Sequence, residues 1–131
     1  MIETIGIVLR IHDIATSQEI IESNLGCPVQ WGTMRDGSQS AVVNLNDDRY
    51  INWDILTQSV REISGGIAEM IDNGAVGIAK LDIGMPFYFP RNYASSITIP
   101  AELCELAGKS SIAIEVTYYA TSEDDEVSSK A

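Results

Sequence analysis

Apolar and polar residues alternate with a period of two over residues 3–12, which is typical of a strand buried on one face. The alternation assigns four residues to the core side of this strand: Ile5, Ile7, Leu9 and Ile11. The same pattern predicts further strands over residues 41–45, 76–83 and 112–120. A strand over residues 29–33 would form a hairpin with residues 41–45, because the Asp36-Gly37 pair between them favours a tight turn.

Three other stretches carry apolar residues at helical spacing, and they predict helices over residues 17–25, 53–73 and 98–108. Thr16 and Glu19 fit a capping box at the start of the first helix, and Gly26 fits its C-terminal stop. The third helix would hold Pro100 in its first turn, where a missing N–H leaves no hydrogen bond unmade.

Glycines and prolines indicate how these elements pack. Gly65 and Gly66 lie in the middle of the long helix, where each costs about 1 kcal/mol relative to Ala. Because the apolar stripe continues through them, we expect them to allow close packing on the sheet. Pro86 and Pro90 bracket an aromatic segment after residues 76–83, and they predict an edge of the sheet.

The order of these elements predicts one α+β domain over residues 1–120, built as a two-layer sandwich. About three helices would cover one face of a mixed, mostly antiparallel sheet, because each strand leaves one polar face. That open face would carry Arg10, His12, Lys80, Asp82, Glu115, Thr117 and Tyr119. Residues 121–131 hold one Val and four consecutive acids, and we expect them to form a disordered acidic tail.

The chain is acidic, and most of the charge lies in the expected domain. Of 131 residues, 19 are Asp or Glu and 8 are Lys or Arg, so the net charge is −11. Residues 1–120 alone carry −8, and the tail adds the rest. Proteins bind phosphate backbones and anionic membranes through basic residues. We therefore expect a basic protein partner, with no nucleic acid and no membrane.

Catalytic and cofactor motifs are missing from the sequence, which has no G-x-G-x-x-G after the first strand, no H-E-x-x-H, no C-x-x-C and no G-x-S-x-G. His12 is the only histidine, so a multi-histidine metal site is impossible. We expect no cofactor, no metal and no enzyme. The alternative is a small-ligand-binding or hydrolytic enzyme in which His12 works with Glu115 or Asp82 across the open face.

The sequence also favours a cytoplasmic location. No Lys or Arg precedes Arg10, and Gly6 interrupts the first apolar stretch, so a signal peptide is not expected. The longest uncharged run, residues 23–34, is far shorter than the roughly 20 apolar residues of a membrane helix. Cys27 and Cys104 are the only cysteines, and two reduced thiols fit a reducing compartment.

Two groups of residues are candidates for contact with a basic partner. The first falls in a loop, where acids beside an aromatic ring suit a basic surface, and consists of Asp47, Asp48 and Tyr50. The second falls on the open sheet face and consists of Asp82, Glu115 and Tyr119. A solvated loop is the alternative interpretation of the first group.

Several short segments resemble an uncharacterised bacterial family, domain of unknown function four-two-seven-nine. The resemblance covers Leu25-Gly26 with Pro28 and Trp31 just beyond it, the long amphipathic helix, the Ile99-Pro100-Ala101-Glu102-Leu103 segment, and the last β-branched strand. The chain departs from the family in lacking a Trp-centred strand before the long helix. Such families are similar in size and acidity to immunity proteins, which neutralise secreted bacterial toxins. The resemblance thus implies an inhibitor of a basic toxin domain, and a housekeeping subunit of an unknown complex is a further alternative.

Overall fold

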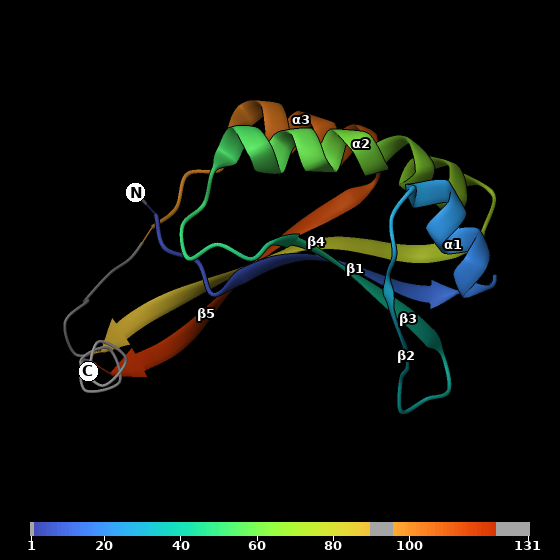
Figure 1. Ribbon diagram of the computed structural model, residues 1–131, viewed down its shortest axis with the longest axis horizontal. Coiled ribbons are helices and arrows are strands. Elements are labelled where there is room, and N and C mark those ends of the chain that lie inside the picture. Colours follow the sequence, from blue (N-terminus) through green and yellow to red (C-terminus); the bar gives the residue numbers. More distant parts are fainter. Residues whose placement is uncertain (1, 90–95, 123–131) are drawn as a thin grey trace.

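The computed structural model describes residues 2–89 and 96–122, whose arrangement is shown in Figure 1. These residues form, in chain order, β1 (Gly6–Ile14), α1 (Gln18–Leu25), β2 (Gln30–Thr33), β3 (Gln39–Asn46), α2 (Trp53–Asp72), β4 (Val76–Phe89), α3 (Ala101–Lys109) and β5 (Ile112–Ser122).

The strands form one mixed sheet in the order β2-β3-β1-β4-β5. Three pairs are antiparallel, and β4 and β5 are parallel because the chain crosses back through α3 between them. The three described helices lie over the same face of this sheet (Figure 1). The predicted α+β two-layer sandwich, with its mostly antiparallel sheet, is therefore confirmed.

The core lies between the helix layer and the strand side chains that point toward it. Ile7, Leu9 and Ile11 of β1 are at most 1% exposed, and α2 contributes the predicted stripe of Leu56, Val60, Ile63, Ile67 and Met70. Ile5 was assigned to the same face, but it is 58% exposed, so that assignment is wrong. Thr4 is buried instead of Ile5. Its hydroxyl donates to the Gly84 carbonyl oxygen at 2.6 Å and accepts from the Gly6 N–H.

Two helix starts differ from the predictions. Ser17, not Thr16, is the N-cap of α1, because its hydroxyl oxygen accepts from the Ile20 N–H at 3.3 Å. The third helix was expected from residue 98, but α3 begins at Ala101, after Pro100 in an extended conformation. Proline disfavours a helical conformation in the residue before it, so the helix does not extend back over residues 98 and 99, and Pro100 itself is the N-cap. Gly26 ends α1 in the left-handed region with φ of 73°, as predicted.

The two glycines of α2 differ in their surroundings. A Cβ on Gly66 would overlap the carbonyl oxygen of Asn24 in α1, whereas a Cβ on Gly65 would meet no atom within 4 Å. The predicted close packing therefore occurs at Gly66, but its neighbour is α1 and not the sheet. Because Gly66 has no side chain, α1 and α2 can approach each other closely at this point.

Strand β4 forms an edge of the sheet in the part that contains Pro86, as the prolines predict. It lies between β1 and β5 only from Ala79 to Gly84, which faces Gly6, the first residue of β1. Beyond that point it pairs only with β5, and Pro86 lies in this part, where its missing N–H breaks no ladder. Pro90 lies outside the described residues.

The last strand is longer than predicted. Thr121 and Ser122 belong to β5, where they pair with Tyr88 and Phe89, so the strand ends two residues later than predicted. The remainder of the expected acidic tail, residues 123–131, lies outside the described residues. Among the described helices, none is long and apolar enough to cross a membrane.

Candidate partner-binding site

The predicted loop acids lie between β3 and α2, in a segment that we call the acidic loop and define as residues 47–54, the connection and the first two residues of α2. Its first turn is held by side-chain amides, as Asn44 Nδ2 donates to the Asp47 carboxylate and Asn46 Oδ1 accepts from the Asp48 N–H at 2.9 Å. Both carboxylates are exposed. Asn52 then caps α2 by accepting from the Ile55 N–H.

The N-terminal segment fixes the middle of this loop. The Thr4 N–H donates to the Arg49 carbonyl at 2.7 Å, the Ile51 N–H donates to the Ile2 carbonyl at 2.9 Å, and Glu3 and Tyr50 form an antiparallel bridge. These backbone bonds join residues nearly fifty positions apart. The acidic loop is therefore part of the folded body and presents its side chains in a defined arrangement.

Glu3 binds the side chains of Tyr88 and Arg49 next to the predicted site. Its carboxylate accepts from the Tyr88 hydroxyl at 2.6 Å and lies 3.4 Å from an Arg49 nitrogen. The hydrogen bond with Glu3 and its charge raise the pKa of Arg49 above its ordinary value. The guanidinium also lies over the Tyr50 ring, 5.6 Å from the centroid, which holds that ring in place.

This cluster changes the charge balance of the acidic loop. Arg49 follows Asp48 directly and would otherwise offset one of the loop acids, but its charge is paired with Glu3. The structure therefore leaves three loop carboxylates without an ion-pair partner among the described residues: Asp47, Asp48 and Asp54. Sequence reasoning missed Glu3 and Tyr88, because nothing local links either residue to the loop.

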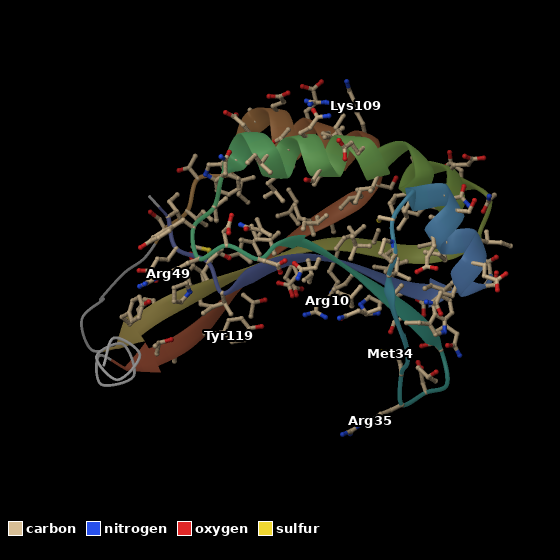
Figure 2. All side chains as sticks on the ribbon, viewed as in Figure 1. Arg10, Met34, Arg35, Arg49, Lys109 and Tyr119 are labelled. Carbon is tan, nitrogen blue, oxygen red and sulfur yellow. The ribbon has the colours of Figure 1, made fainter. Side chains whose placement is uncertain are left out.

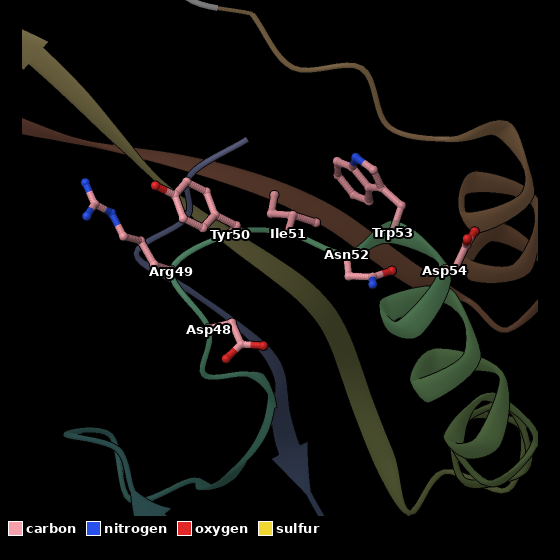
Figure 3. Close-up of a pocket in the computed structure, with 7 residues that line it drawn as sticks. All are labelled: Asp48, Arg49, Tyr50, Ile51, Asn52, Trp53 and Asp54. Atoms are coloured by element: carbon pink, nitrogen blue, oxygen red, sulfur yellow. The ribbon is translucent and has the colours of Figure 1, made fainter. Parts of the chain in front are cut away.

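Residues 48–54 also line a pocket of about 670 Å³. Figure 3 shows the rings of Tyr50 and Trp53 on one side of the segment and the side chains of Asp48 and Asn52 on the other. Tyr50 is 37% exposed, whereas Trp53 is half-buried against the core. The Tyr50 ring and the Asp48 carboxylate therefore lie on different sides of the segment, and each can contact a lysine or arginine side chain of a partner separately.

The second predicted group lies on the open sheet face, where Asp82 has a structural role. It is only 7% exposed, and its carboxylate accepts from Arg10 Nε at 2.9 Å and from the Thr117 hydroxyl at 3.1 Å. These bonds join the central strand β1 to β4 and β5. Because both carboxylate oxygens are occupied and little of the side chain reaches solvent, Asp82 offers a partner few contacts.

Glu115 and Tyr119 lie further along β5 on the same open face. The Glu115 carboxylate is 3.4 Å from Lys80 Nζ, and its side chain remains 48% exposed. Tyr119, labelled in Figure 2, is 46% exposed and borders a hollow of about 150 Å³ with Ile5, Gly84 and the Arg10–Asp82 pair. The hollow exists because Gly84 has no side chain, and a Cβ there would meet the Tyr119 ring at 3.3 Å.

The two predicted groups do not form one site. Within the described parts of the chain, no hydrogen bond, ion pair or shared pocket lining connects Asp47, Asp48 or Tyr50 with the open-face residues. The acidic loop keeps its carboxylates available, whereas the open-face carboxylates are paired with Arg10 and Lys80. We therefore take the acidic loop as the better candidate.

The residues of the enzyme alternative are also separated. His12 faces Ile78 of β4, four residues from Asp82, which corresponds to about 13 Å along a strand. Asp82 instead pairs with Arg10, and Glu115 with Lys80. Thus neither carboxylate is hydrogen-bonded to the imidazole in the described structure.

Metal-binding chemistry and the cysteines add no further site. No group of three or more His, Cys, Asp or Glu side chains among residues 2–89 and 96–122 is arranged to hold a metal ion. Cys27 and Cys104 are both free thiols. Burial raises the pKa of Cys27, and the charge of Glu22 raises it further, so this thiol is less reactive than an ordinary one.

Comparisons with protein-family models, with curated protein sequences and with solved structures give no match for this chain.

Proposed function

We propose that the protein is an immunity-type inhibitor that binds a basic bacterial toxin domain through its acidic loop. The observation that carries this proposal is the distribution of charge. Every described lysine and arginine except Arg35 lies in an ion pair with an acid of the same chain. The surplus acids, including those of the acidic loop, are left to attract a basic partner.

In the proposed mechanism, the protein binds the toxin domain and thereby blocks its activity. Long-range attraction toward the acidic body speeds the encounter, and the fixed loop then supplies local contacts through Asp47, Asp48 and Tyr50. Because the loop is held by backbone bonds to the N-terminal segment, little ordering entropy is lost when it binds. The free thiols Cys27 and Cys104 support a cytoplasmic location for this inhibitor.

The test compares charge reversals in the loop before α2 and in the last turn of α2. Asp47→Lys with Asp48→Lys reverses two acids of the loop, and Glu69→Lys with Asp72→Lys makes the same charge change at the C-terminal end of this helix, whose 20 residues span about 30 Å. Tagged wild type and both variants are used to recover partners from the native host. Toxicity of the recovered protein is then measured with each form of the inhibitor co-expressed.

We expect the wild type and the Glu69/Asp72 variant to recover the same basic protein and suppress its toxicity, and the Asp47/Asp48 variant to do neither. Association should also slow as salt rises from 50 to 500 mM, because the Debye length falls from about 14 to about 4 Å. Equal recovery by all three forms would reject the acidic loop as the site. Recovery of no basic protein, or of one that is harmless, would reject the inhibitor and favour a housekeeping subunit.

A further inference from the structure

The two outer strands of the sheet differ in how they are protected from pairing with another chain. Strand β2 has only four residues, which limits the ladder that a new strand could form. Strand β5 has eleven residues, and it pairs with β4 in continuous register from Ile112 to Ser122, without a bulge. No described segment pairs with its other side.

The composition of β5 does not block its outer side either. Natural edge strands are usually interrupted by lysine, proline or a bulge. Between Ile112 and Ser122 there is no lysine, arginine or proline, and Glu115 is the single charged residue. Most of the other residues are β-branched or aromatic, which favours strand pairing. Strand β5 thus presents a long, regular edge with one charge.

An antiparallel pair of two β5 strands is self-complementary in one register. If Thr117, the midpoint of the strand, lies on the two-fold axis, all eleven residues overlap. On the open face Glu115 then faces Tyr119 of the second copy, and the two Thr117 residues face each other. On the helix face Val116 faces Tyr118. Moving the axis to Glu115 would set two carboxylates directly opposite, which is unfavourable.

We propose that the protein forms a homodimer through antiparallel pairing of its β5 strands, centred on Thr117. The axis stands perpendicular to the sheet, so a ten-stranded sheet results with the helices of both copies on one side. Pairing also covers Tyr118 and Tyr119, which are 41% and 46% exposed in the single chain. In both copies the middle of the acidic loop pairs with residues 2–4 and not with β5.

The register can be tested at a single exposed position. Tyr119→Glu places a carboxylate opposite Glu115 twice in the dimer, and Tyr119→Lys places an ammonium group there twice. Met34→Glu and Met34→Lys make the same charge changes at a 46% exposed residue of the β2–β3 turn, beside the opposite edge of the sheet (Figure 2). Sedimentation equilibrium of the full chain at 150 mM salt gives the dissociation constant of each form.

We expect the wild type to approach twice the 14.3 kDa chain mass with rising concentration. Two like-charge pairs should raise the dissociation constant of the Tyr119→Glu dimer about tenfold above that of Tyr119→Lys. The two Met34 variants should differ from each other by less than about threefold, since position 34 acts only through net charge. A wild type that stays monomeric at every concentration, or a Tyr119 pair that differs no more than the Met34 pair, would overturn the proposal.

Discussion

Replacing each of the two adjacent glycines of α2 with alanine should change the free energy of unfolding in opposite directions. Gly65 and Gly66 share one helix and differ in what a methyl group would meet. At Gly65 there is open space, whereas at Gly66 a Cβ would overlap the Asn24 carbonyl oxygen and lie 3.1 Å from its carbon. The obstacle is backbone, so no side-chain rotation can relieve it.

The magnitudes follow from these two environments. In a helix interior, alanine is favoured over glycine by about 0.8–1 kcal/mol, so Gly65→Ala should raise the free energy of unfolding by about that amount. Gly66→Ala gains the same propensity, but forcing α1 away from α2 costs about 1–3 kcal/mol for an ordinary overpacked site, and more where the backbone must move. We expect a net loss of about 1–2 kcal/mol for Gly66→Ala.

Urea unfolding of the full chain, followed by far-ultraviolet circular dichroism, measures both effects. The midpoint should rise for Gly65→Ala and fall for Gly66→Ala, with the slope unchanged. Ile21 and Leu25, which α1 buries, report any displacement of that helix through slowed or accelerated amide exchange. If Gly66→Ala stabilises the protein as much as Gly65→Ala does, the close contact between α1 and α2 is not a feature of the fold in solution.

Two further predictions concern single side chains. Asp82→Asn should lower the free energy of unfolding by about 1–2 kcal/mol, because it weakens the charge-assisted bonds to Arg10 and Thr117. Glu115→Gln removes only an exposed ion pair and should change this free energy by less than about 0.5 kcal/mol. Equal losses for the two variants in urea unfolding would contradict the structural role of Asp82. Cys27 should react with iodoacetamide more slowly than the exposed Cys104, because its raised pKa leaves less thiolate at a given pH. Equal reaction rates of the two cysteines at pH 8, measured by peptide mass spectrometry, would contradict the burial of Cys27.

The sequence by itself predicted the elements that depend on local periodicity. The two-residue alternation of β1 and the three-to-four-residue spacing of α2 reflect burial of one face, and each is complete within its own segment. Gly26 could be assigned as a helix stop for the same reason, because the left-handed conformation is a local preference. The exposed acids of the loop could also be predicted from the sequence, since Asp47 and Asp48 are adjacent in the chain.

Only the tertiary structure decided how these elements meet. The pairing of Glu3 with Arg49 and Tyr88, and of Asp82 with Arg10 and Thr117, joins residues 35 to 85 positions apart. No local pattern encodes such pairs, because they depend on strand order and register. The same holds for Gly66, whose neighbour is a helix and not the sheet. Strand order also leaves one side of β5 without a neighbouring strand among the described residues, since an edge is a property of the sheet and not of a single strand.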